Sequence, residues 1–111
     1  MRDPIVVPCD TYAQSVHPSM IFEWDDAKDE TTRDERGFGF ADAAGIFFGR
    51  YVEWQDTRRD YSEVRMVTVG EADGLFYTVV YTDRQDAEGQ QVRRLISARL
   101  ANKKERLLWR A

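Results

Sequence analysis

The sequence has few of the side chains that bind metals or form disulfides. Its 111 residues include one cysteine, Cys9, and one histidine, His17. A single cysteine cannot close an internal disulfide, and this pair falls short of the ligand set of a zinc site. No stretch approaches the roughly 20 apolar residues of a membrane span. We therefore expect a cytoplasmic protein with no metal, no cofactor and no membrane segment.

The signature loops of common nucleotide-binding and hydrolytic enzymes are missing as well. The chain has no GxxxxGK[ST], GxSxG or HExxH pattern, and GFGF at 37–40 lacks the third glycine of a dinucleotide fingerprint. A Ser-His-Asp or Cys-His triad would depend on His17. With these sites absent, the residues that remain as candidates for a functional site are arginine, glutamate and tyrosine.

What the sequence does have is an uneven distribution of charge. The net charge is −4, yet RRLISARLANKKERLLWR at 93–110 contains seven Arg and Lys residues and one acid, Glu105. A protein that is acidic overall still has a strong local field where its cations gather. Two interpretations stay open: a solvated helix face, or a surface that binds a polyanion.

Periodicity and turn signals predict an α+β domain. Residues 1–19 contain three prolines and predict an irregular arm with a short strand at 5–7, followed by a single domain at 20–111. We expect two N-terminal helices, the first capped by Asp25, an antiparallel sheet of about four strands with the helices on one face, and a C-terminal helix opened by Asn102 and Glu105. The helices are expected at about 26–35, 40–48 and 103–109, a short strand at 21–24, and the strands of the meander at 51–55, 64–69, 75–82 and 92–98.

The residues left on this sheet suit phosphodiester chemistry on RNA. Cleavage by a 2′-hydroxyl needs a proton acceptor, cations against the developing negative charge and a proton donor. Glu63 could accept the proton, and Arg65, Arg94 and Arg99 have planar forks that match phosphate oxygens. Alternation along 92–98 places Arg94 and Ser97 on opposite faces of their strand. The structural alternatives stay open: an ion pair of Glu63 with Arg65, and core packing of the tyrosines.

Residues 20–110 carry a series of motifs in one order. They are MIFEWDDAK, RGFGFADAAGIFF, YSEVRMVTVG, YTVVYTDR and RRLISARLANKKER. In this series the chain resembles the BrnT family of bacterial type II toxins, whose pattern reads FEWD-x-x-K, E-x-R-x-x-x-x-G, V-V-Y-T-x-R and R-I-I-S-A-R-x-A-x-x-x-E-R.

The resemblance implies a RelE-like fold, cleavage of RNA that inhibits growth, and a cognate antitoxin similar to BrnA. Such an antitoxin has a ribbon-helix-helix part, and its complex with the toxin binds operator DNA. The resemblance also implies that the enzyme is a metal-independent endoribonuclease. The expected catalytic residues are Glu63, Arg65, Arg94 and Arg99, and the expected RNA contacts are Arg36, Tyr81, Ser97 and Lys103.

The chain departs from the family pattern in the loop after the first helix. Where the family has Lys-His-Gly, this sequence has Glu35, Arg36 and Gly37. The change removes the side chain that titrates most readily near neutral pH. An alternative function is therefore a catalytically degenerate member that serves as an antitoxin-binding or corepressor module. A third is a plain RNA- or DNA-binding domain.

Overall fold

The structure, a computed structural model, describes residues 5–7 and 20–111. The helical segments are α1 (Asp26–Arg36), α2 (Phe40–Ala44), the 3₁₀ turn η1 (Gly45–Phe48) and α3 (Lys103–Arg110). The strands are β1 (Ile5–Val7), β2 (Met20–Glu23), β3 (Tyr51–Gln55), β4 (Met66–Ala72), β5 (Leu75–Gln85) and β6 (Gln91–Leu100). The predicted α+β class and the predicted strand at 5–7 are confirmed, while the rest of the predicted arm lies outside the described residues. No helix in the described ranges is long and apolar enough to cross a membrane.

The strands form one sheet in the order β1-β2-β6-β5-β4-β3. Strands β3 to β6 make the antiparallel meander that the sequence predicts. The expected antiparallel sheet of about four strands was incomplete, because six strands take part in the described portion of the chain and β2 pairs with β6 in parallel. Pairing between segments so far apart in the chain leaves no local sequence signal.

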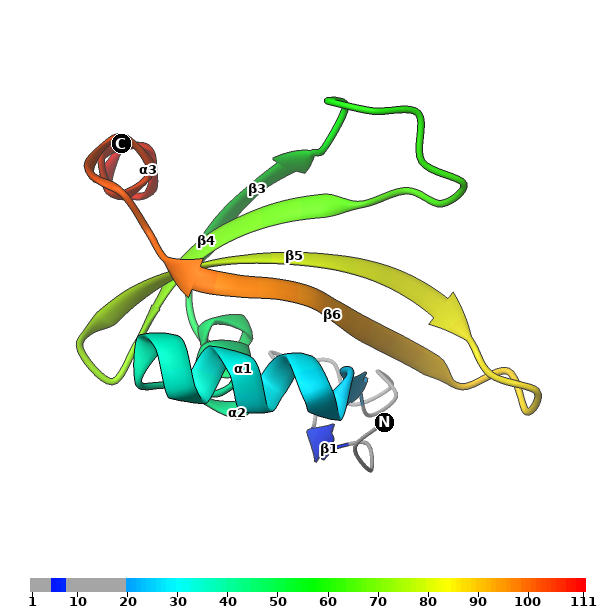
Figure 1. Cartoon of the computed structure of the whole chain (residues 1–111). Helices are drawn as coiled ribbons and strands as arrows, with labels where there is room; N and C mark the ends of the chain where they lie inside the picture. The colour runs from blue at the N-terminus through cyan, green and yellow to red at the C-terminus, as the bar shows by residue number, and fades with distance from the viewer. Residues whose placement is uncertain (1–4, 8–19) are drawn as a thin grey trace.

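Helices cover both faces of the sheet, so the expectation of helices on one face is wrong for α3. Figure 1 shows α1 and α2 on one side and α3 on the other. The α2 side holds the core, which includes Phe22, Trp24 and Phe40. On the opposite side the Thr78 hydroxyl donates to Glu105 of α3 at 2.9 Å. Because α3 is short, it leaves much of this second face open (Figure 1).

Local side-chain chemistry sets the ends of the helices as predicted. Asp25 accepts from the backbone N–H of Ala27 at 2.8 Å and opens α1, which Gly37 ends with φ 83°. Asn102 and Glu105 form a capping box at the start of α3, each accepting at 2.9 Å from the other's backbone N–H.

A β-bulge interrupts the pairing of β5 with β6. Val80 pairs with Ser97, whereas the next residue, Tyr81, pairs with Leu95, so Ile96 is an extra residue on β6. The bulge shifts the alternation of side chains along the strand by one position. As a result Arg94 and Ser97, paired with Thr82 and Val80, lie on the same face of the sheet. The prediction that they lie on opposite faces is therefore wrong.

Candidate functional site

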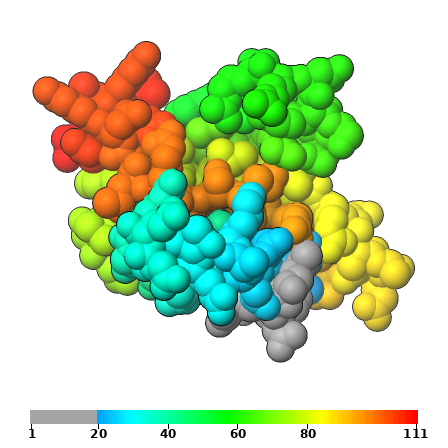
Figure 2. Space-filling view, viewed as in Figure 1, coloured from blue at the N-terminus to red at the C-terminus, as the bar shows by residue number. Residues whose placement is uncertain are grey.

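The open face of the sheet is hollowed beside the bulge. Figure 2 shows α1, α3 and the loop at 56–65 around a depression whose floor includes β6. Three adjoining cavities of about 370, 260 and 380 Å³ lie here, and we call them the α1 cavity, the Arg94 cavity and the Arg99 cavity. Ile96 lines the first two, and Ser97 lines the first and third. The bulge thus lies where the three cavities meet.

The Arg94 cavity brings together Glu63, Arg65 and Arg94. Arg65 Nε donates to Glu63 Oε2 at 2.7 Å, and the Arg65 guanidinium lies 4.1 Å from the ring centroid of Tyr61. Arg94 Nη1 lies 3.5 Å from Glu23 Oε1 at the end of β2. A carboxylate beside each arginine therefore restrains its guanidinium at the cavity wall.

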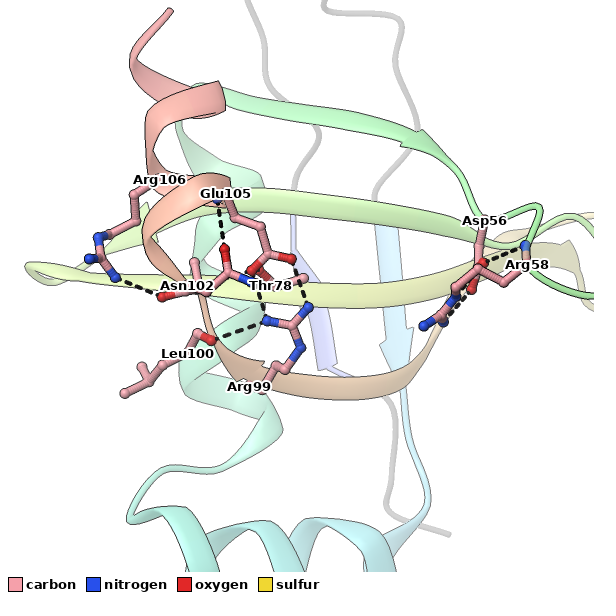
Figure 3. Close-up of polar contacts among 9 residues, drawn as sticks. Asp56, Arg58, Thr78, Arg99, Leu100, Asn102, Glu105 and Arg106 are labelled. Atoms are coloured by element: carbon pink, nitrogen blue, oxygen red, sulfur yellow. Dashed lines mark hydrogen bonds and ion pairs between the residues drawn. The ribbon is translucent and has the colours of Figure 1, made fainter.

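The Arg99 cavity is bounded on its α3 side by a two-point ion pair. Arg99 Nη1 and Nη2 donate to the two carboxylate oxygens of Glu105 at 2.8 and 2.7 Å (Figure 3). Glu105 also accepts from Thr78 on β5, so one carboxylate joins β5, β6 and α3. The Arg99 guanidinium, more than the backbone N–H of Asn102, lowers the pKa of Glu105 to about 2.

The loop after β3 contributes a second ion pair to the same cavity. Arg58 Nε and Nη2 donate to Asp56 Oδ1 and Oδ2 at 2.8 and 2.7 Å (Figure 3). The Asp56 side chain is 1% exposed and the Arg58 side chain is 75% exposed. The Arg58 guanidinium holds the pKa of Asp56 well below its usual range. Asp56 therefore stays ionised and fixes an arginine that faces solvent.

The α1 cavity lies where the edge of β6 has no strand beside it. Strand β2 pairs with β6 only as far as Arg94, and α1 continues along the remaining edge. Lys28 Nζ donates to the carbonyl oxygen of Ile96 at 2.8 Å, and Arg36 Nη1 donates to that of Ala98 at 2.9 Å. Two cations of α1 thus satisfy backbone acceptors on both sides of Ser97.

The cations around the bulge come from α1, from the loop at 56–65 and from β6. Guanidinium groups fit phosphate oxygens, and several of them around one depression suit a polynucleotide better than a small anion. Among the described residues, no three or more His, Cys, Asp or Glu side chains form a group that could hold a metal ion.

A comparison with protein families agrees with this geometry. The family model described as ribonuclease toxin, BrnT, of type II toxin-antitoxin system matches residues 24–105. The chain belongs to the BrnT family. BrnT proteins are ribonuclease toxins of type II toxin-antitoxin systems, and membership implies an antitoxin partner. No curated protein matches the chain.

Most of the site residues predicted for this BrnT chain gather around the bulge. Glu63, Arg65 and Arg94 line one cavity, Ser97 and Arg99 line the next, and Arg36 lines the α1 cavity. These six residues come from α1, the loop before β4 and β6, and the fold brings them to one depression.

Tyr81 and Lys103 are placed elsewhere. Tyr81 lies on the opposite face of the sheet, 3% exposed, and its hydroxyl donates to Glu53 at 2.7 Å. Burial raises the pKa of Tyr81. Arg93 stacks on its ring at 4.0 Å, so the cations of 93–110 are divided between the two faces. Lys103 is exposed at the start of α3 and is not among the residues that line the three cavities.

The residues that line these cavities but were not predicted as site residues include Lys28, Asp56 and Arg58. In the loop between the strands expected at 51–55 and 64–69, only Glu63 was predicted as a site residue, although Asp and Arg two positions apart can form a local ion pair in a loop. Lys28 stands in the family pattern FEWD-x-x-K, but its contact with the carbonyl oxygen of Ile96 is a tertiary feature that the pattern does not predict.

Proposed function

We propose that this BrnT protein is a metal-independent endoribonuclease that cleaves RNA in the cytoplasm and thereby inhibits growth. The observation that supports it best is the bulge at Ile96, which places Arg94, Ser97 and Arg99 on one open face. In the absence of the bulge, Arg94 would face the opposite side of the sheet from Ser97 and Arg99.

The proposed reaction uses the 2′-hydroxyl of the RNA as the nucleophile. Glu63 takes the proton of that hydroxyl, and the 2′-oxygen bonds to phosphorus while Arg65 and Arg94 contact the negative charge that develops there. The bond from phosphorus to the 5′-oxygen of the next nucleotide then breaks, which leaves a 2′,3′-cyclic phosphate, and the 5′-oxygen takes a proton from water. Arg99, Ser97 and Arg36 hold neighbouring parts of the strand. Because arginines supply the charge stabilisation and the nucleophile belongs to the substrate, the proposed chemistry needs no metal ion.

The test is cleavage of ribosome-free RNA in excess EDTA, and of ribosome-bound mRNA in the Mg²⁺ that ribosomes need, by the parent and by Arg94→Ala. We expect the parent to cut at least one substrate and the variant to be slower by at least about tenfold. Arg84→Ala is the matched control, because Arg84 donates to the same Glu23 oxygen at 2.6 Å but lies outside the three cavities. Equal rates for the two variants would overturn the assignment of Arg94.

The alternative is a degenerate BrnT that binds an antitoxin without cutting RNA. It is motivated by Arg36 in place of the family's histidine and by the carboxylates that pair with the site arginines. A parent that cuts neither substrate and does not slow growth, yet forms an operator-binding complex, would support it. For the partner we propose a BrnA-like antitoxin with a ribbon-helix-helix part that directs the complex to operator DNA.

A further inference from the structure

The Arg99 cavity combines a charged rim with an apolar floor. Arg58 and Arg99 lie on its rim, and Trp54, Val67 and Val80 contribute apolar surface. Val67 pairs with both Trp54 and Val80, so these three residues lie side by side on neighbouring strands of the same face. The volume, about 380 Å³, is within the range of small-molecule sites, roughly 300–1,000 Å³.

We propose that this cavity holds one nucleotide of the RNA substrate, with its phosphate between Arg58 and Arg99 and its base against Trp54. The proposal rests on the RNA-cleaving function above and adds a subsite to it. Ser97 lines this cavity and its chain neighbour Ile96 lines the Arg94 cavity, so the nucleotide would lie beside the one that reacts there.

Arg58 is positioned for this role by Asp56. Its Nε and Nη2 are bonded to the carboxylate, which directs Nη1 away from Asp56. Asp56 is itself fixed, since it accepts from the backbone N–H of Arg58 at 3.2 Å and from the hydroxyl of Tyr61 at 3.3 Å. The loop therefore presents a guanidinium with little freedom left to lose on binding.

Arg58 and Arg99 are close enough for their like charges to interact. The charge of Arg58 opposes that of Arg99, although the bond to Glu105 still raises the pKa of Arg99 overall. An anion placed between two guanidinium groups removes this repulsion and gains charge-assisted hydrogen bonds from both. In an RNA substrate, that anion would be a phosphodiester, because each nucleotide of the strand carries one.

Trp54 is the reason for proposing that the cavity holds a whole nucleotide and not a phosphate group alone. Its side chain projects from the edge strand β3 and is 38% exposed, so part of the indole is open to a ligand in the cavity. Unstacked bases of single-stranded RNA bind to such aromatic faces. The apolar floor therefore suits the base of a nucleotide, and the two fixed cations suit its phosphate.

The test is the affinity of each variant for a mixed-sequence 2′-O-methyl oligoribonucleotide, measured over a range of salt concentrations. The substrate cannot be cut, because its 2′-hydroxyls are blocked. Loss of one phosphate contact lowers the slope of log K against log salt by about 0.7 for a single strand. We expect that decrease in Arg58→Ala and no decrease in the control Arg59→Ala, whose residue is exposed in the same loop outside the cavity lining.

Trp54 and Asp56 give independent readouts. Trp54→Ala should weaken binding at least about fivefold without changing the salt slope, and Trp54→Tyr should restore it.

Asp56→Asn removes a negative charge, so it would tighten binding if charge alone mattered. If Asp56 positions Arg58, the same variant weakens binding instead. Thermal unfolding of each variant checks that the fold is intact.

The outcomes separate the subsite from the function on which it rests. If the parent binds the oligonucleotide and Arg58→Ala behaves like Arg59→Ala, the subsite is wrong while RNA cleavage stands. If Trp54→Ala binds the oligonucleotide as tightly as the parent, the proposal that the base lies against Trp54 is wrong. If the parent neither binds nor cuts RNA, both proposals fail together.

Discussion

Residue 36 stands where the BrnT pattern has histidine, and its side chain reaches the β6 backbone beside Ser97. Arginine keeps a positive charge there but does not exchange protons near neutral pH. We predict that Arg36→His raises the rate of RNA cleavage by about tenfold or more, as an added acid–base group does. The gain should follow a single ionisation at about pH 6.5, the ordinary pKa of histidine.

Cleavage rates across a pH series, with Arg33→His on the same helix as the control, measure this effect. An Arg36→His variant no faster than the parent at any pH would mean that residue 36 does not take part in proton transfer. Residue type and motif single out Arg94, Arg99, Glu63 and Arg65 as candidates, and the structure places them in neighbouring cavities, while their catalytic roles stay predictions. Asp56 and Arg58 were not recognised, because their part in the site depends on the loop lying beside Ser97 and Arg99 of β6.

Three secondary-structure elements are joined by the carboxylate of Glu105. Glu105 belongs to α3, and it accepts hydrogen bonds from Thr78 on β5 and from Arg99 on β6. Its pKa is lowered from 4.5 to about 2, so the ionised form stabilises the fold. A carboxylate with a lowered pKa contributes fully above its unfolded value and loses that contribution as the pH falls through its folded value. We predict that Glu105→Gln lowers the free energy of unfolding at neutral pH by about 2–3 kcal/mol.

Urea unfolding of the parent and of Glu105→Gln at several pH values checks the prediction. The difference between them should be constant above pH 4.5 and should shrink as the pH falls from 4.5 toward 2. A pH-independent difference would show that packing, rather than charge, explains the loss. Lys104→Met on the same helix is the control, because Lys104 is exposed and its loss should leave the unfolding free energy nearly unchanged.

The sequence also predicted most of the elements that meet here, and the reason is local. Caps at Asp25 and Asn102 and the turn at Asp73 and Gly74, with φ 51° and 85°, depend on neighbouring residues only. The bulge at Ile96 and the parallel pairing of β2 with β6 are tertiary features. Neither feature changes the local pattern of apolar and polar residues. Because the bulge was not foreseen, Arg94 and Ser97 were wrongly predicted to lie on opposite faces of the sheet.

At the scale of the whole molecule, β1 is an edge strand of the sheet, and every residue that lines the three cavities follows it in the chain. Strand β1 pairs with β2 through Ile5–Phe22, Val6–Ile21 and Val7–Met20. Removing residues 1–19 would leave β2 as an uncovered edge, which favours association between chains. We predict that a chain beginning at Met20 folds and cleaves RNA at the parent rate, with an unfolding free energy lower by about 1–3 kcal/mol.

Urea unfolding, size-exclusion chromatography over a range of concentrations and the cleavage assay test this prediction together. The 111-residue chain with glycine at all three β1 positions is the matched control, because glycine weakens a strand without shortening the chain. If loss of β1 pairing is the cause, this control should be destabilised and self-associate in the same direction as the truncated chain. Failure of the truncated chain to fold would mean that residues 20–111 are not a complete domain. A slower cleavage rate in a folded truncated chain would instead mean that the first 19 residues contribute to the site.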